Sequence, residues 1–401
     1  MIRHAALFVV VATSALGQVV PWAAETTSIP SAQAGDLAIV TTNGGLLVGT
    51  DTAQVGAYGW VPLNGQLAQV VPLGALKSAD ARGPFLFVTS QNSALFAFFD
   101  GDAGLEQLNP PSFSILSAGF VALRAKGGDD FMLAVTRTAS VQRWDVHIED
   151  GGVSFMPIDQ VTLPQVPGGI AADDRTGNLF ITQPTRGVLL LGPPTGGAAT
   201  PTFVASIDAG QLGANIGGVA LLPLRDGGVW VLTANPASAT IVAHEFNQSS
   251  GTLDFVGAAA IGAPDGGAAR AALPGHLDTT LAALPGFPKG LLAVHDGVLA
   301  NYKLVSLEAL DRVIPLPELA WDASVDGGDL DAGSSSDGGA LDGGAPDGGR
   351  RDGGLIIGGG VSGPGQGIEP MPQCSCGSPL LLFLPALLLL WWIRRPAFRR
   401  P

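Results

Sequence analysis

The sequence predicts an all-β fold for residues 36–320, and the repeat of its strands favours a six-bladed β-propeller. Many short apolar runs are separated by Gly, Asp, Asn and Pro, the residues of turns. Long stretches with the 3.6-residue period of a helix are absent from this region. A unit of strand, turn and strand recurs at roughly blade-sized steps, near 37–48, 85–99, 131–147, 179–191, 229–246 and 290–305. This periodicity favours the propeller, although it does not by itself exclude a large sandwich.

The first 24 residues have the pattern of a secretory signal peptide. Arg3 and His4 give a short basic start, residues 5–16 are almost wholly apolar, and small residues follow. Two cleavage sites remain open, one at Ala15-Leu16-Gly17 and one at the Ala23-Ala24 pair. A buried N-terminal strand or helix is the alternative to a signal. We therefore expect residues 1–24 to direct export from the cytoplasm.

The composition excludes one class of function and one means of stabilisation. The formal net charge is −14, and no cluster of Lys and Arg occurs before Arg394. A nucleic-acid-binding protein needs such a cluster to neutralise phosphates, so no nucleic-acid partner is expected. Both cysteines, Cys374 and Cys376, lie near the C-terminus. We therefore expect the strands to fold without disulfides.

Residues 324–367 are expected to form an acidic spacer. Asp-Gly-Gly recurs at Asp326, Asp337, Asp342, Asp347 and Asp352, with spacings of 11, 5, 5 and 5 residues. Calcium-binding Asp-Gly repeats recur at about nine residues with an apolar position in each turn. The spacings here differ and apolar residues are sparse, so a flexible, self-repelling linker is favoured.

Residues 374–401 predict a C-terminal anchor. Cys374 and Cys376-Gly377 precede an apolar helix with two tryptophans, and Arg394 and Arg395 follow it. An ordinary single membrane span is one interpretation. The order of cysteine motif, apolar helix and arginine cluster also resembles the C-terminal sorting signals of Gram-negative bacteria, most closely the myxobacterial type, which a rhomboid- or CAAX-like sorting protease reads. Such signals hold a protein in the cell envelope or at the cell surface, and processing can remove the helix.

Six segments in the folded region share one family resemblance. The stretch PGGIAADDRTGNLFITQ (167–183) resembles the acidic signature of the β-propeller phytases. Further fragments resemble other segments of that family in the same order: SADAR (78–82), TRTASVQRW (136–144), NIGGV (215–219), FPKGLLAVHDG (287–297) and NYKLVSLE (301–308). The resemblance implies a six-bladed propeller that binds calcium and hydrolyses phosphomonoesters of inositol hexakisphosphate.

The resemblance also assigns candidate site residues. Asp173, Asp174 and Asp296 would be residual calcium ligands, and Arg82 and Lys303 would contact phosphate or another anionic ligand. Calcium takes six to eight oxygen ligands, and cations neutralise the charge of a transferring phosphoryl group. Asp173 and Asp174 can equally form a β-turn, because Asp side chains cap turns.

Several acidic positions of the family are not acidic here. The resemblance places carboxylates at five positions that hold other residues here: Arg175, Gln183, Pro184, Asn215 and Gly217. We therefore expect phytase activity to be weak or lost, and we expect acids restored together at four of them, all except Pro184, to raise calcium affinity. Two alternatives remain: a non-catalytic propeller that binds a ligand or protein, and a structural protein of the cell envelope.

Overall fold

The computed structural model describes residues 18–319, apart from 30–33, 54–55, 111, 116–117, 196–198, 210, 267–268 and 317–318. The described residues belong to one compact unit. The expected spacer and the anchor residues Cys374, Cys376, Arg394 and Arg395 lie outside the described residues. In the part of the chain that is described, no helix is long and apolar enough to cross a membrane.

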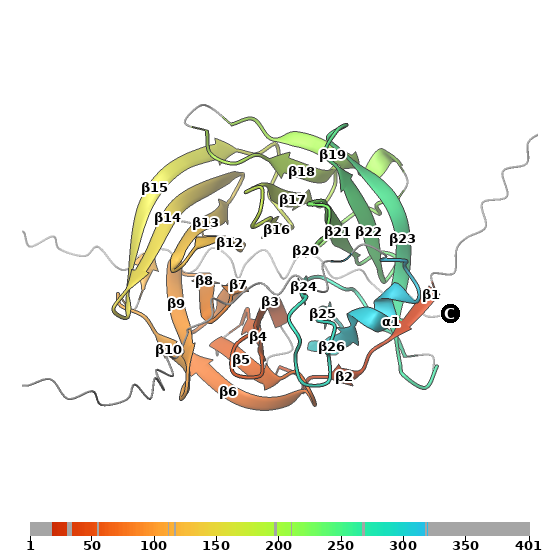
Figure 1. Ribbon diagram of the computed structural model, residues 1–401, viewed down its shortest axis with the longest axis horizontal. Coiled ribbons are helices and arrows are strands. Elements are labelled where there is room, and N and C mark those ends of the chain that lie inside the picture. The colour runs from red at the N-terminus through yellow and green to blue at the C-terminus, as the bar shows by residue number, and fades with distance from the viewer. Residues whose placement is uncertain are drawn as a thin grey trace, which may run out of the picture. The chain divides into compact units, whose positions relative to one another are not determined.

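Six sheets of mainly antiparallel strands stand around a central axis, which confirms the predicted six-bladed propeller (Figure 1). Blade 1 contains β3 (Ala34–Val40), β4 (Leu46–Asp51), β5 (Gly56–Val61) and β6 (Gln66–Pro72). Blade 2 contains β7 (Leu76–Arg82), β8 (Phe85–Ser90), β9 (Ala94–Gly101) and β10 (Gly104–Gln107), with β11 (Phe113–Ser114) paired to β9. Blade 3 contains β12 (Val121–Gly127), β13 (Asp130–Arg137), β14 (Ser140–Glu149) and β15 (Gly152–Thr162).

The remaining three blades have the same order from axis to periphery. Blade 4 contains β16 (Gly169–Ala172), β17 (Leu179–Gln183), β18 (Gly187–Leu191) and β19 (Thr202–Ser206), followed by a short 3-10 turn, η1 (Ile207–Ala209). Blade 5 contains β20 (Val219–Pro223), β21 (Val229–Asn235), β22 (Thr240–Asn247) and β23 (Thr252–Gly262). Blade 6 contains β24 (Leu277–Thr280), β25 (Leu291–Asp296) and β26 (Asn301–Ser306), and the short helix α1 (Leu307–Asp311) follows.

The N-terminal segment completes the last two blades. Strand β2 (Ala24–Glu25) pairs antiparallel with β26 and is the fourth strand of blade 6. Strand β1 (Gln18–Pro21) pairs parallel with β23 and adds a fifth strand to blade 5. The propeller therefore also includes residues that precede the expected domain start at residue 36.

The second strand of each blade is the most buried, because both of its faces pack against a neighbouring blade. Strands β8, β17, β21 and β25 have every residue buried. Their sequences are accordingly short continuous apolar runs, without the alternation of a half-exposed strand. Between blades 2 and 3, for example, Phe87, Leu133 and Trp144 belong to one core cluster.

Turns lie at two ends of the propeller. Because neighbouring strands of a blade are antiparallel, successive turns alternate between these ends. The end that carries the turns between first and second strands, such as the turn after Arg82, is called here the Arg82 rim. The end that carries the turns between second and third strands, such as the turn after Asp296, is called the Asp296 rim.

The second strands also end in a repeated pattern that closes the turns on the Asp296 rim. A polar residue ends each strand, and a threonine or another small or polar residue precedes it: Thr50-Asp51, Thr89-Ser90, Thr136-Arg137, Thr182-Gln183, Ala234-Asn235 and His295-Asp296. Asp51 and Asp296 accept hydrogen bonds from turn amides through Oδ1, at 2.8 Å from Ala53 and 3.1 Å from Val298. The hydroxyls of Thr89 and Thr182 donate to carbonyls before the next blade, at Gly119 and Gly217, both at 2.6 Å.

Candidate functional site

An arginine surrounded by carboxylates occupies the channel near the Arg82 rim. Arg82, at the end of β7, forms ion pairs with Asp80 (2.9 Å) and with Asp174 (3.2 Å) of the β16–β17 turn. Its Nη2 also donates to the carbonyl of Ala172 at 3.3 Å. Asp278, on β24, adds a third negative charge that acts on this guanidinium. Side chains from blades 2, 4 and 6 thus meet at the axis, and we call Asp80, Arg82, Asp174 and Asp278 the channel cluster.

The carboxylates of the channel cluster also hold neighbouring blades together. Asp80 Oδ2 accepts a hydrogen bond from the Leu123 amide at 2.6 Å, which joins blade 2 to blade 3. Asp174 Oδ1 accepts from the Ala125 amide at 2.9 Å. Asp278 Oδ2 accepts from the Ile39 amide at 2.9 Å, which joins blade 6 to blade 1.

Burial and mutual repulsion shift the pKa values of this cluster. Burial and, to a smaller extent, the charge of Asp80 raise the pKa of Asp278 to about 7, against the lowering effect of Arg82. Burial also raises the pKa of Asp80, against the lowering effect of Arg82. For Arg82, burial acts to lower the pKa, but the carboxylates of Asp80 and Asp174 outweigh it and raise the pKa above its usual value. The arginine therefore stays charged and offsets part of the negative charge.

The raised pKa of Asp278 predicts a pH dependence of stability. The unfolded carboxyl has a pKa of about 3.9, so between roughly pH 4 and pH 7 the folded chain keeps a proton that the unfolded chain has lost. This stabilisation is complete below about pH 4 and disappears as pH rises through about 7. In thermal unfolding, the wild type should lose several degrees of Tm relative to Asp278→Asn between pH 4 and pH 8. Asp254→Asn, at an exposed position, serves as the control. Parallel pH profiles for wild type and Asp278→Asn would contradict the assignment.

Asp173 and Asp174 have different roles within the same turn. Asp173 is buried and accepts hydrogen bonds from the Arg175 amide at 3.2 Å and the Thr176 hydroxyl at 2.5 Å, so its carboxylate caps its own turn. Asp174 extends to Arg82 and to the Ala125 amide. Asp173 thus has the geometry of a residue that caps a β-turn, which the sequence offered as the alternative to a calcium ligand.

Asp296 and Lys303 form a separate pair in blade 6. Both side chains are 1 % exposed, and Lys303 Nζ lies 3.7 Å from Asp296 Oδ2. The same ammonium pairs with Glu25 of β2 and lies 4.5 Å from the ring centroid of Trp22. Asp296 Oδ1 accepts from the amides of Val298 and Leu299.

The structure therefore brings the candidate residues together in two pairs at opposite rims. Arg82 meets Asp174 at one rim, and Lys303 meets Asp296 at the other. Within the described ranges, no group of three or more His, Cys, Asp and Glu side chains is arranged to hold a metal ion. The residues proposed for calcium are paired with cations and turn amides instead.

Three of the positions considered for acid replacement are also divided between the rims. Arg175 lies on the Arg82 rim, where Nη1 donates to the Leu224 carbonyl at 2.7 Å and Nη2 to the carbonyl of Gly228. Gln183 is fully buried, and its Nε2 donates to the Gln165 carbonyl at 3.1 Å. The amide of Asn215 donates to the Pro184 carbonyl at 2.7 Å, which places this residue by the β17–β18 turn on the Asp296 rim.

A second polar group in the channel was not predicted from the sequence. Asp36 accepts a hydrogen bond from the Ser78 hydroxyl, and His276 Nδ1 lies 3.3 Å from Asp36 Oδ1. The His276 ring centroid is 5.9 Å from that of His295, whose pKa falls to about 3 because of burial and, to a smaller extent, the nearby His276. These residues come from blades 1, 2 and 6, and no local spacing in the sequence connects them.

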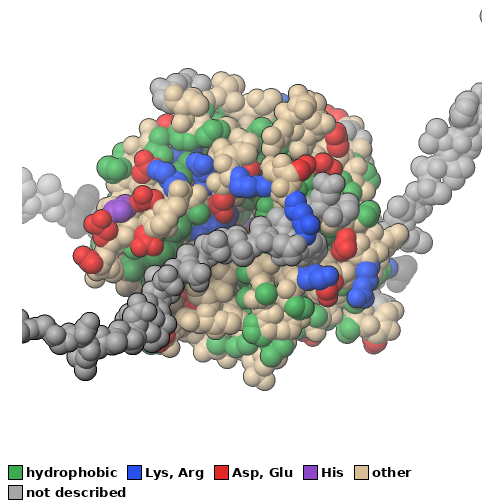
Figure 2. Space-filling model, in the orientation of Figure 1, with side chains coloured by type: hydrophobic (Ala, Val, Ile, Leu, Met, Phe, Trp, Pro, Cys, Tyr) green, Lys and Arg blue, Asp and Glu red, His purple; other side chains and the backbone are tan. Residues whose placement is uncertain are grey.

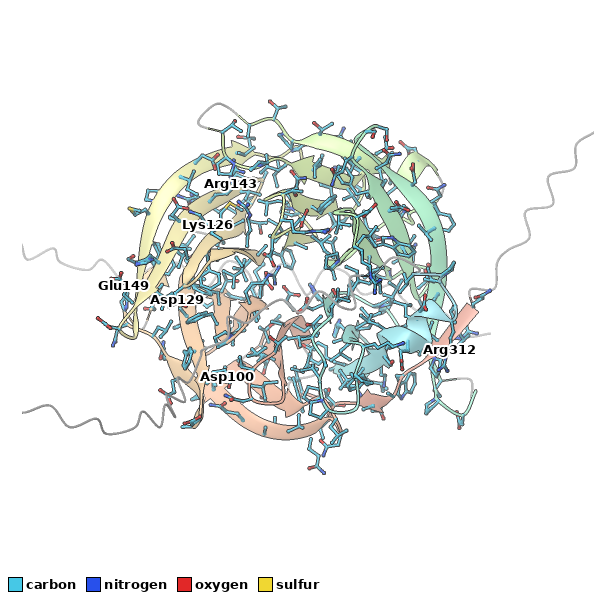
Figure 3. All side chains as sticks on the ribbon, viewed as in Figure 1. Asp100, Lys126, Asp129, Arg143, Glu149 and Arg312 are labelled. Carbon is cyan, nitrogen blue, oxygen red and sulfur yellow. The ribbon has the colours of Figure 1, made fainter. Side chains whose placement is uncertain are left out.

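Charged side chains also gather away from the axis. At the tip of blade 3, His147 lies between Asp130 and Glu149, with 2.6 Å from Nε2 to the Glu149 carboxylate. Hydrogen bonds to Glu149 and Asp130 raise the pKa of His147. Figure 2 shows acidic side chains over this tip, and Figure 3 places Asp129 and Glu149 there. Arg143, also labelled in Figure 3, is fully buried and pairs with Asp159, so it holds the outer strands of blade 3 together.

Comparisons with known proteins give distant structural neighbours. The chain matches no protein-family model, and no curated protein sequence matches it. The major Malassezia sympodialis allergen Mala s 1 is similar at 10 % identity over 68 % of this chain and 91 % of that chain, with a TM-score of 0.44. The Cps50 (Swd1) β-propeller domain of Myceliophteria thermophila shares 11 % identity over 70 % of this chain and 98 % of that domain, with a TM-score of 0.41. Kuenenia stuttgartiensis hydrazine synthase shares 10 % identity over 68 % and 82 %, with a TM-score of 0.44.

Fold and site together define a class: a six-bladed β-propeller whose channel arginine, Arg82, is ion-paired with Asp80 and Asp174.

Proposed function

We propose that this chain is an exported β-propeller, held in the cell envelope or at the cell surface, on a scaffold of the phytase type. Its hydrolysis of phosphomonoesters of inositol hexakisphosphate is weak or lost. Calcium and an inositol phosphate, or another anionic ligand, are weak ligands at most.

One observation carries the chemical half of this proposal: Arg82 is ion-paired with Asp80 and Asp174. A phosphoryl-transfer site needs cations directed at the substrate, and a calcium cluster needs carboxylates free to ligate. In the channel cluster Arg82 is directed at Asp80 and Asp174, and both carboxylates accept hydrogen bonds from backbone amides of a neighbouring blade. Calcium-dependent phosphate release from inositol hexakisphosphate is the experiment that tests this half.

The cellular half of the proposal is supported by sequence patterns at both ends of the chain. Deleting residues 374–401 removes the cysteine motif, the apolar run and the terminal arginines. We expect this deletion to move most of the propeller from the membrane fraction to the medium, as measured by immunoblotting of both fractions. Replacing only Arg394 and Arg395 with Gln tests whether the arginines are needed for retention. If the truncated chain stayed in the membrane fraction, the tether would lie elsewhere.

A binding function without catalysis is favoured by one surface feature. Leu273, Val298 and Leu299 are 55 %, 63 % and 52 % exposed on the Asp296 rim. Leu273 lies close to Gly297 of the β25–β26 turn, and the same turn carries Val298 and Leu299. Exposed apolar groups that gather at one place are typical of binding surfaces. Loss of a captured partner on replacing all three with Ser would support this second function.

A further inference from the structure

The N-terminal strands are part of the propeller core. Val20 of β1 is completely buried and belongs to the cluster that also contains Ile261, Val305 and Leu310. Val19, its neighbour, is 39 % exposed. The backbone of β1 extends blade 5 by pairing with β23 from Ala259 to Gly262. A chain without β1 would expose apolar core surface and leave the edge of β23 unpaired.

The two residues between β1 and β2 form hydrogen bonds with both blade 5 and blade 6. The amide of Trp22 donates to the Gly262 carbonyl at 3.0 Å, and the amide of Ala23 donates to the Leu304 carbonyl at 2.7 Å. The Trp22 ring lies against the buried ammonium of Lys303. A buried ammonium is stable only where it is paired, so Trp22 and Glu25 together help to hold Lys303. Residues 18–25 thus join blade 5 to blade 6, and we call them the N-terminal latch.

The latch discriminates between the two cleavage sites that the sequence leaves open. Cleavage after Ala24 would remove Gln18–Ala24, which includes all of β1 and Trp22. Cleavage after Gly17 would leave the whole latch. The sequence Ala15-Leu16-Gly17 has small residues at the two positions that a signal peptidase requires, the last residue before the cut and the third before it.

We infer that a signal peptidase cleaves between Gly17 and Gln18, and that the mature chain closes the propeller with its first eight residues. Water adds across the Gly17–Gln18 peptide bond, so Gly17 leaves with a new carboxylate and Gln18 gains a free α-amino group. This inference rests on the export that is proposed above.

The N-terminus of the protein purified from cells that express the full chain tests the inference. N-terminal sequencing and intact mass should identify Gln18 as the first residue. A mature chain that begins at Ala24 or Glu25 would overturn the inference and leave the proposed export intact. A precursor that keeps Met1 and stays in the cytoplasm would overturn both.

Two neighbouring substitutions in the full chain give a second measurement. Val20→Asp buries a carboxylate in the core and should lower the Tm of the mature protein by at least about 5 °C, or prevent its accumulation. Val19→Asp is the matched control at the half-exposed neighbour and should change Tm by less than about 2 °C. If cleavage removed both positions, both variants would yield the same mature protein with the wild-type Tm, and the inference would be wrong.

Discussion

We expect this propeller to release phosphate from inositol hexakisphosphate at a rate at least about 100-fold below that of an intact phytase-type propeller. That factor corresponds to about 2.7 kcal/mol of transition-state stabilisation, at 1.36 kcal/mol for each factor of ten. Loss of a single electrostatic contact in an active site typically costs 10²–10³ in rate. Here Arg82 is neutralised by Asp80 and Asp174, and Lys303 is buried against Asp296.

The assay measures released phosphate with and without millimolar calcium, on the purified full chain and on an intact phytase-type propeller. Arg82→Met provides the internal control, because it removes the candidate phosphate-binding cation. If the Arg82→Met variant keeps the same residual rate of phosphate release as the wild type, that activity does not come from the channel. A calcium-dependent rate typical of the family would show that the assignment of the non-acidic positions is wrong, and the enzyme interpretation would stand.

The strand repeat could be predicted because the main strands of each blade follow one another directly in the sequence. The six predicted units fall on six different blades, and five of them match the second and third strands, such as β8–β9 and β25–β26. The first unit, 37–48, falls on β3 and β4, the first and second strands of blade 1. The repeated ending of the second strands, such as Val88-Thr89-Ser90 and Ile181-Thr182-Gln183, was also visible in the sequence and would have strengthened the prediction of a repeat.

Other features depend on contacts between distant parts of the chain. Arg82 and Asp174 are 92 positions apart, and only closure of the propeller brings them together. The N-terminal latch could not be found from periodicity, because β1 and β2 are short and follow directly on an apolar signal-like stretch. Glu25, one partner of Lys303, is 278 positions away in the sequence and also reaches it only when the propeller closes.

Gly217→Glu, one of the four acid replacements considered above, should damage the fold instead of creating a calcium ligand. A Cβ at residue 217 would lie 2.3 Å from the carbonyl oxygen of Gly275, which is backbone and cannot rotate away. The adjacent amides are engaged at the same place: Gly217 donates to Ala234 at 2.9 Å, and Gly218 donates to Gly275 at 2.6 Å. Glycine is required here because blades 5 and 6 approach too closely for any side chain. At this one position, therefore, we expect the acid replacement to destabilise the fold.

We expect Gly217→Glu to lower the free energy of unfolding by about 3 kcal/mol or more, measured by urea denaturation, or to prevent accumulation of soluble protein. Gly217→Ala should already cause most of the loss, since the Cβ atom makes the clash and the carboxylate only adds to it. Gly192→Glu is the matched control, because a Cβ there would meet no atom within 4 Å. Its stability should stay within about 0.5 kcal/mol of the wild type. A Gly217→Glu variant as stable as Gly192→Glu would mean that the blades separate at this point, and a carboxylate at residue 217 could then reach the channel as the phytase resemblance requires.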